Sequence, residues 1–123
     1  MELNATVQFL LETQIQFKIC HWQTKEYSRH MAFGGIYDAL DDLIDKFVEV
    51  YMGKYGRFQL TDNEKTINIE NLNELDLIKF VKIVKSTLLE FEGSLSEKDT
   101  DLLNIKDEML AEINKLVYLL TLG

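Results

Sequence analysis

The chain has two histidines, His21 and His30, and a regular series of acidic residues follows the second one. Steps of 8, 3, 4 and 4 residues separate His30 and the members of that series. On a helix, such steps keep the side chains within a sector of roughly 100°. Imidazole and carboxylate groups together are a ligand set for iron, manganese or zinc. The spacing therefore predicts a metal-binding helix face formed by His30, Asp38, Asp41, Asp45 and Glu49.

The same acidic residues also fit a simpler interpretation, the solvated side of an amphipathic helix. The formal charge of −8 is most simply explained by solubility, and attraction of cations is the second interpretation. No cluster of lysine and arginine stands out, so we expect no direct binding to nucleic acid.

Distance limits what one chain can do with these ligands. His30 and Asp45 are 15 residues apart, which is about 22 Å along a helix, whereas metal-ligand bonds are about 2 Å long. Two copies of the helix, antiparallel about a twofold axis near Asp38 and Ala39, would bring His30 of one copy to Asp45 and Glu49 of the other. Two equivalent sites per dimer would result. Gly34, Gly35 and Ala39 are small enough to permit close approach of the two helices.

The elements that must position these residues are helices. The chain has no proline, and its apolar residues recur mostly at three- and four-residue spacing. We expect helices over about residues 3–24 and 27–52, a long connection over 54–72, a third helix from the cap Asn73 to Gly93, and a fourth after Ser96 and Asp99. Gly53 and Gly56 should end the second helix. The sum is an all-α, ferritin-like four-helix bundle with a long crossover between helices two and three.

The first helix is apolar on more than one side. Its inward side should carry Val7, Leu10, Leu11, Ile15, Ile19 and Trp22, while Phe9, Phe17 and Cys20 lie on other sides. A helix of this kind is usually covered on more than one face, so we expect a homo-oligomer.

Length and composition limit the other possibilities. The 123 residues, 46% of them hydrophobic, suit one domain over residues 1–123. The lone Cys20 excludes an internal disulfide. The start, MELNATVQFLLE, lacks a positively charged leader, and no apolar run approaches about 20 residues, so we expect a soluble cytoplasmic protein without membrane contact.

A di-iron centre within a single bundle is disfavoured. Such a centre needs Glu-x-x-His on two helices, and the sequence contains no Glu-x-x-His. On the fourth helix, Glu108 and Glu112 flank the predicted apolar stripe without joining it. That stripe consists of Leu102, Ile105, Met109, Ile113, Leu116, Val117 and Leu120.

The pair His21-Trp22, followed by His30, Asp45 and Glu49, resembles the ferroxidase signature of the Dps family, small ferritin-like proteins from starved cells. In that family the second histidine precedes an aspartate and a glutamate by 15 and 19 residues, as His30 does here. The resemblance covers residues 5–52 well, and the second half agrees as crossover, helix and helix.

The resemblance implies an iron site between subunits, with His21 and His30 from one chain and Asp45 and Glu49 from its partner as catalytic residues and metal ligands. It implies one or two irons at a dimer interface, with zinc or manganese as other candidate metals. It also implies a hollow shell, of twelve subunits in that family, that oxidises Fe(II) with peroxide or oxygen and stores the ferric product.

The chain departs from the family pattern in two places. Where the family has an aspartate four residues after the second histidine, this chain has Gly34. Asp38, one turn further on, is the candidate replacement as a metal ligand. The interval between His21 and His30 is also a few residues shorter than usual in the family.

The leading hypothesis from the sequence is a Dps-like ferroxidase that sequesters iron as a homo-oligomer. The alternative is a non-enzymatic ferritin-like assembly protein with a degenerate metal site, for example within a viral particle, and Gly34 favours it. A third interpretation is zinc or manganese bound at the interface for stability alone.

Overall fold

The structure is a computed structural model that describes residues 2–123, without the side chains of residues 92 and 93. The described residues form four helices and one short 3₁₀ turn, and no strand, which confirms the all-helical prediction. No helix in this part of the chain has the length and apolar character that crossing a bilayer requires. The elements are α1 (Leu3–Gln23), α2 (Tyr27–Tyr55), η1 (Asp62–Glu64), α3 (Glu74–Ser94) and α4 (Thr100–Leu119).

The helix ends follow local capping chemistry. The Asn73 side chain accepts a hydrogen bond from the Asp76 N–H at 2.8 Å, which confirms the predicted cap of α3. The prediction that Gly53 helps to end α2 is wrong, because α2 continues through it to Tyr55. Gly56 ends the helix instead: its φ of +95° lies in the left-handed region, and its N–H donates to Met52 O at 2.8 Å.

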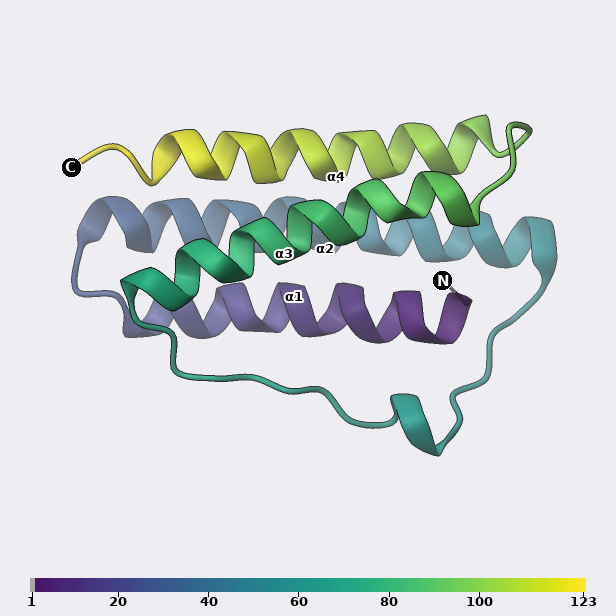
Figure 1. Ribbon diagram of the computed structural model, residues 1–123, viewed down its shortest axis with the longest axis horizontal. Helices are drawn as coiled ribbons and strands as arrows, with labels where there is room; N and C mark the ends of the chain where they lie inside the picture. Colours follow the sequence, from purple (N-terminus) through teal and green to yellow (C-terminus); the bar gives the residue numbers. More distant parts are fainter. Residues whose placement is uncertain (1) are drawn as a thin grey trace.

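The four helices lie along the long axis of the molecule (Figure 1). After α2, the connection of residues 56–73 returns along the outside of α1 to the opposite end of the molecule, where α3 begins (Figure 1). As a result, α2 and α3 run in one direction, while α1 and α4 run in the other.

One apolar core contains buried side chains from all four helices. Phe17 of α1 is fully buried and packs against Phe33 of α2 and Phe80 of α3, with ring centroids 6.3 and 5.3 Å away. Phe91 of α3 also packs against Phe47 of α2, with ring centroids 5.9 Å apart. Five of the buried residues of α4 lie on its predicted apolar stripe: Leu102, Ile105, Met109, Ile113 and Leu116. The sixth, Lys106, lies off that stripe.

The inward side of α1 differs from the prediction. Val7 and Leu10 are buried as expected, but Leu11 and Trp22 are 41% and 65% exposed. Phe17 and Cys20, which the sequence placed on other sides, are buried instead. The helix is therefore rotated, and its exposed apolar side faces away from the core.

Polar side chains of α1 explain this rotation. Asn4, Gln8, Glu12 and Gln16, spaced four residues apart, all hydrogen-bond the backbone of the connection. Gln16 is 3% exposed and makes two of these bonds with Glu70, donating to its carbonyl at 2.9 Å and accepting from its N–H at 2.8 Å. A buried amide with satisfied hydrogen bonds can occupy a position that an apolar pattern assigns to a hydrophobic side chain.

A second polar cluster joins the end of α2 to the start of α4. The Asp99 side chain is 3% exposed and accepts hydrogen bonds from Lys54 Nζ at 2.7 Å, from Ser96 N at 2.9 Å and from the Tyr55 hydroxyl. The hydrogen bonds from Lys54 and Tyr55 hold the pKa of Asp99 well below its usual range. Asp99 thus fixes the turn between α3 and α4 against the end of α2.

Candidate metal site

The structure brings the two histidines together. His21 lies in the last turn of α1 and His30 in the first turn of α2, and the short link between the antiparallel helices places them side by side. Their rings stack, with centroids 3.8 Å apart and planes 15° from parallel. Both residues are half-buried.

Each histidine is fixed by the backbone of the other. His21 Nδ1 lies 2.5 Å from His30 O, and His30 Nδ1 lies 2.8 Å from His21 O. Because a carbonyl oxygen can only accept, both Nδ1 atoms carry the proton. In the neutral rings Nε2 then holds the lone pair, which is the usual arrangement of a metal-binding histidine.

Gly34 makes this arrangement possible. A Cβ atom at residue 34 would lie 3.0 Å from His21 Cε1 and 3.1 Å from His21 Nδ1, closer than ordinary contact. The His21 ring therefore occupies the space that a larger residue would need. A larger side chain at residue 34 would therefore require the His21 ring to move.

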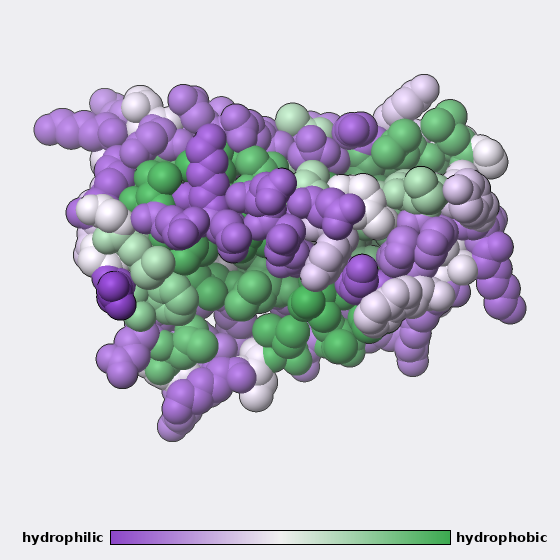
Figure 2. Space-filling model, turned by 180° about the vertical axis from the view of Figure 1, so that it is seen from behind, coloured by the Kyte–Doolittle hydropathy of each residue, from purple (hydrophilic) through white to green (hydrophobic). Residues whose placement is uncertain are grey.

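The acidic candidates lie elsewhere on α2. Asp38, Asp45 and Glu49 are exposed, and no hydrogen bond or ion pair joins their side chains to any other residue in the described part of the chain. Hydrophilic side chains run across the middle of this face (Figure 2). Asp41 differs, because it accepts a hydrogen bond from Gln14 Nε2 at 3.0 Å.

One chain does not assemble a complete site. Within residues 2–123, no group of three or more His, Cys, Asp or Glu side chains could hold a metal ion. Asp38 and Asp45 lie about 12 and 22 Å along the helix from His30. The chain therefore presents two nitrogen ligands at one end of α2 and carboxylates further along it.

Two of the small residues expected at the twofold contact lie beside other parts of the same chain. Gly34 faces His21, and Gly35 lines a small cavity beside α4 with Glu112 and Lys115. Ala39 is half-buried. Of the three, Gly35 is exposed, and a Cβ there would meet nothing within 4 Å.

Lys18 was missed by the sequence reasoning. Its Nζ lies 5.5 Å from the ring centroid of Trp22 and 4.6 Å from that of Tyr37, so it bridges α1 and α2 beside the histidines. The available signal was its position one turn before His21 and Trp22. Trp22 itself is exposed and does not pack into the core.

These features define an all-helical protein with a backbone-fixed histidine pair beside an acidic helix face. The chain belongs to a family of unknown function, DUF5856, whose model matches residues 21–120. The matched segment of this chain therefore begins at His21. It is also similar to the uncharacterized 14.6 kDa protein in the mobD-ri intergenic region of Enterobacteria phage T4. That similarity is 48% identity over 48 residues, and it spans 39% of this chain and 38% of the phage protein. No solved structure matches the chain.

Proposed function

We propose that the protein binds Fe(II) between two copies of the chain and oxidises it with peroxide or oxygen, as a compact ferritin-like protein of the Dps type. The observation that carries the proposal is the reciprocal pairing of His21 and His30 through Nδ1, which leaves the lone pair of each Nε2 atom available to a metal. Iron is the substrate in this reaction and also the cargo.

The path of the chain supports a ferritin-like fold. A four-helix bundle with one long crossover between its second and third helices is the ferritin-like arrangement. The connection of residues 56–73 runs the length of the molecule between two parallel helices (Figure 1), as that arrangement requires.

The exposed acidic face of α2 supports a site between subunits. In an antiparallel pair of α2 helices, His30 of one copy would lie near Asp45 and Glu49 of the other, and Asp38 would lie near the twofold axis. Imidazole nitrogens suit Fe(II), and carboxylate oxygens stabilise the more highly charged Fe(III). The missing carboxylate at Gly34 predicts a site with fewer oxygen ligands than in the Dps family.

Iron titration of substituted proteins tests this proposal. Ferric absorbance would be followed on addition of Fe(II), with oxygen or peroxide, to protein whose mass has been measured by light scattering. We expect saturable oxidation by the wild type, a loss of at least about tenfold in His30→Ala and Asp45→Ala, and unchanged mass. Asp42→Ala removes a neighbouring exposed carboxylate outside the proposed ligand set and is the matched control. Unchanged oxidation in His30→Ala and Asp45→Ala would reject the site.

A mixing experiment tests whether two chains share the site. His30→Ala and Asp45→Ala are each inactive alone under the proposal, but a mixed dimer contains one site with both residues intact. Random reassociation of equal amounts should restore about a quarter of the wild-type sites. No recovery, with mixed dimers verified by mass spectrometry, would contradict a shared site.

A non-enzymatic assembly protein is the second candidate, and Gly34 is the observation that favours it. The similarity to a phage protein suits a role in a viral particle or an infected cell. Under this candidate, His30→Ala and Asp45→Ala change neither oxidation nor mass. If the site instead binds zinc or manganese for stability alone, adding either metal would raise the thermal stability of the protein, and adding Fe(II) would produce no ferric signal.

A further inference from the structure

A second feature of the molecule, separate from the histidines, is an apolar groove between α3 and α4. Its volume is about 460 Å³, and its apolar lining is Leu77, Ile78, Val81, Val117 and Leu120. It opens near the end of α4 because α3 slants relative to α4 (Figure 1). Volumes of about 300–1,000 Å³ are typical of pockets that bind small molecules.

The walls of the groove are incompletely covered by the chain. Ile78 is 50% exposed and Val117 is 45% exposed, although the sequence placed Val117 on the inward stripe of α4. Exposed apolar area of this kind is stabilised when another apolar group covers it, by about 25 cal/mol per Å².

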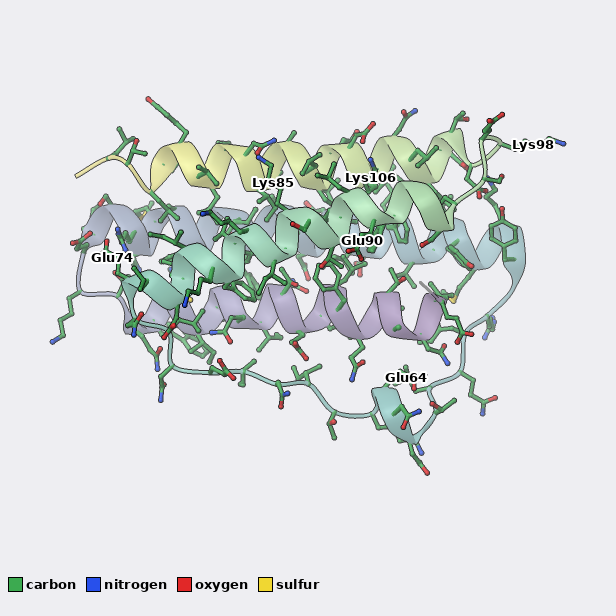
Figure 3. The ribbon with its side chains drawn as sticks, in the orientation of Figure 1. Glu64, Glu74, Lys85, Glu90, Lys98 and Lys106 are labelled. Carbon is green, nitrogen blue, oxygen red and sulfur yellow. The ribbon has the colours of Figure 1, made fainter. Side chains whose placement is uncertain are left out.

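The charges that line the groove are mostly positive. Arg29 is already engaged, because it forms ion pairs with Glu26 at 3.1 Å and with Glu74 at 2.5 Å. Lys82 and Lys85 also line the groove and form no ion pair with any residue that the structure describes. Lys85 lies between α3 and α4 (Figure 3). In a chain of net charge −8, two such lysines beside an apolar groove favour an anionic occupant.

We infer that this groove binds an anionic single-chain amphiphile, with its carboxylate at Lys82 and Lys85 and its alkyl chain along Ile78, Val117 and Leu120. The small volume favours a lipid-like molecule over a helix of a partner protein, which would need a longer groove. The inference does not depend on the proposed iron chemistry.

Calorimetric titration with dodecanoate, kept below its micelle concentration, tests the inference. We expect saturable binding of one molecule per chain, weakened at least about tenfold by Lys82→Glu with Lys85→Glu. The matched control is Lys79→Glu with Lys98→Glu, which changes the charge equally at exposed lysines outside the groove. Dodecyltrimethylammonium, with the same alkyl chain and the opposite charge, should bind much more weakly.

A second substitution tests the apolar part. Val117→Trp should fill the groove and abolish dodecanoate binding, whereas Tyr118→Trp, at an exposed position outside the groove, should leave it unchanged. Absence of saturable binding, equal binding of the cationic amphiphile, or no effect of the Lys82 and Lys85 changes would overturn the inference. So would a fall in oligomer mass in Val117→Trp alone, because the occupant would then be a second copy of the chain.

Discussion

His21 and His30 show how two residues can fix each other's chemistry. Each backbone carbonyl accepts the Nδ1 proton of the other ring, so neither ring can present Nδ1 to a metal without breaking a hydrogen bond. The sequence identified both residues as ligand candidates but could not foresee their pairing, because that depends on the link between α1 and α2. It treated Gly34 as a missing ligand and as a small residue at the contact between two helices, whereas the structure gives it a steric role beside His21.

Gly34→Ala should displace His21 without unfolding the protein. The added Cβ would lie 3.0 Å from His21 Cε1, so the ring must move and its hydrogen bond to His30 O should lengthen. We expect weaker binding of Fe(II) or Mn(II), by about tenfold or more. Calorimetric titration and histidine NMR spectra would measure the change.

Gly35→Ala is the control for that substitution. A Cβ at Gly35 would meet nothing within 4 Å, so the change should stabilise α2 by up to about 1 kcal/mol and leave metal binding unaltered. Equal metal binding by the two variants would contradict the steric role of Gly34.

At the scale of the helices, apolar spacing predicted α3 and α4 well and α1 less well. The third helix was expected to carry Leu77, Phe80, Val81, Val84, Leu88 and Phe91 inward, and all of these except the partly buried Phe80 are buried. The buried residues of α4 lie on its predicted stripe, apart from Lys106. On α1, Thr13, Gln14 and Gln16 are buried. A pattern that counts only apolar side chains cannot place them, because the groups that satisfy Gln14 and Gln16 come from α2 and from the connection, far away in the sequence.

The cap of α3 should contribute measurably to stability. Asn73→Ala removes the bond to the Asp76 N–H and should lower the free energy of unfolding by about 1 kcal/mol. Asn73→Asp keeps a side-chain acceptor at the same place and should preserve most of the stability. Urea unfolding of both variants would measure the difference, and an equal loss in the two would refute the capping role.

The Asp99 cluster predicts a specific dependence of stability on pH. In the folded protein the pKa of Asp99 is lowered. Its contribution to the free energy of unfolding is therefore fully present above the unfolded pKa of about 3.9, and it is lost as pH falls toward the folded pKa. The urea midpoint of the wild type should therefore exceed that of Asp99→Asn near neutral pH, and the difference should shrink below about pH 4.

A control separates this cluster from general acid effects. Asp62→Asn removes an ion pair with Lys65 that is largely exposed, and such pairs contribute little. Its urea midpoint should follow that of the wild type at every pH. If the Asp99→Asn difference stays constant down to pH 2, the ionised carboxylate is not the source of the stability.

At the scale of the whole molecule, the chain has large exposed apolar residues on more than one helix. Leu11 and Trp22 lie on α1, and Leu75, Ile78 and Ile83 lie on α3. The proposed twofold contact pairs two α2 helices, and Trp22 lies beside α2 through the shared contact with Lys18. Trp22 would therefore lie at the edge of the subunit interface, while Leu75 and Ile83 of α3 would lie outside it.

Trp22→Glu should therefore weaken the oligomer. Covering an aromatic side chain contributes about 1.5–3 kcal/mol, so its loss should raise the dissociation constant by about 10- to 100-fold. Leu75→Glu, at a position that is equally exposed on α3, should have no such effect. Sedimentation equilibrium would measure both, and equal behaviour of the two variants would place the interface elsewhere.

The connection of residues 56–73 has a further consequence for how the chain can vary. Helix α2 has 29 residues and is therefore about 44 Å long, and the connection must return over most of that length. Its 18 residues, between Tyr55 and Glu74, reach about 60 Å at full extension. The connection therefore exceeds the length of α2 by about 16 Å, or about five residues, and its 3₁₀ turn and its hydrogen bonds to α1 use part of that excess. Deletions of more than about five residues would displace the start of α3, whereas insertions of any length would only enlarge a surface loop. Related chains should therefore vary in this segment mainly by insertion.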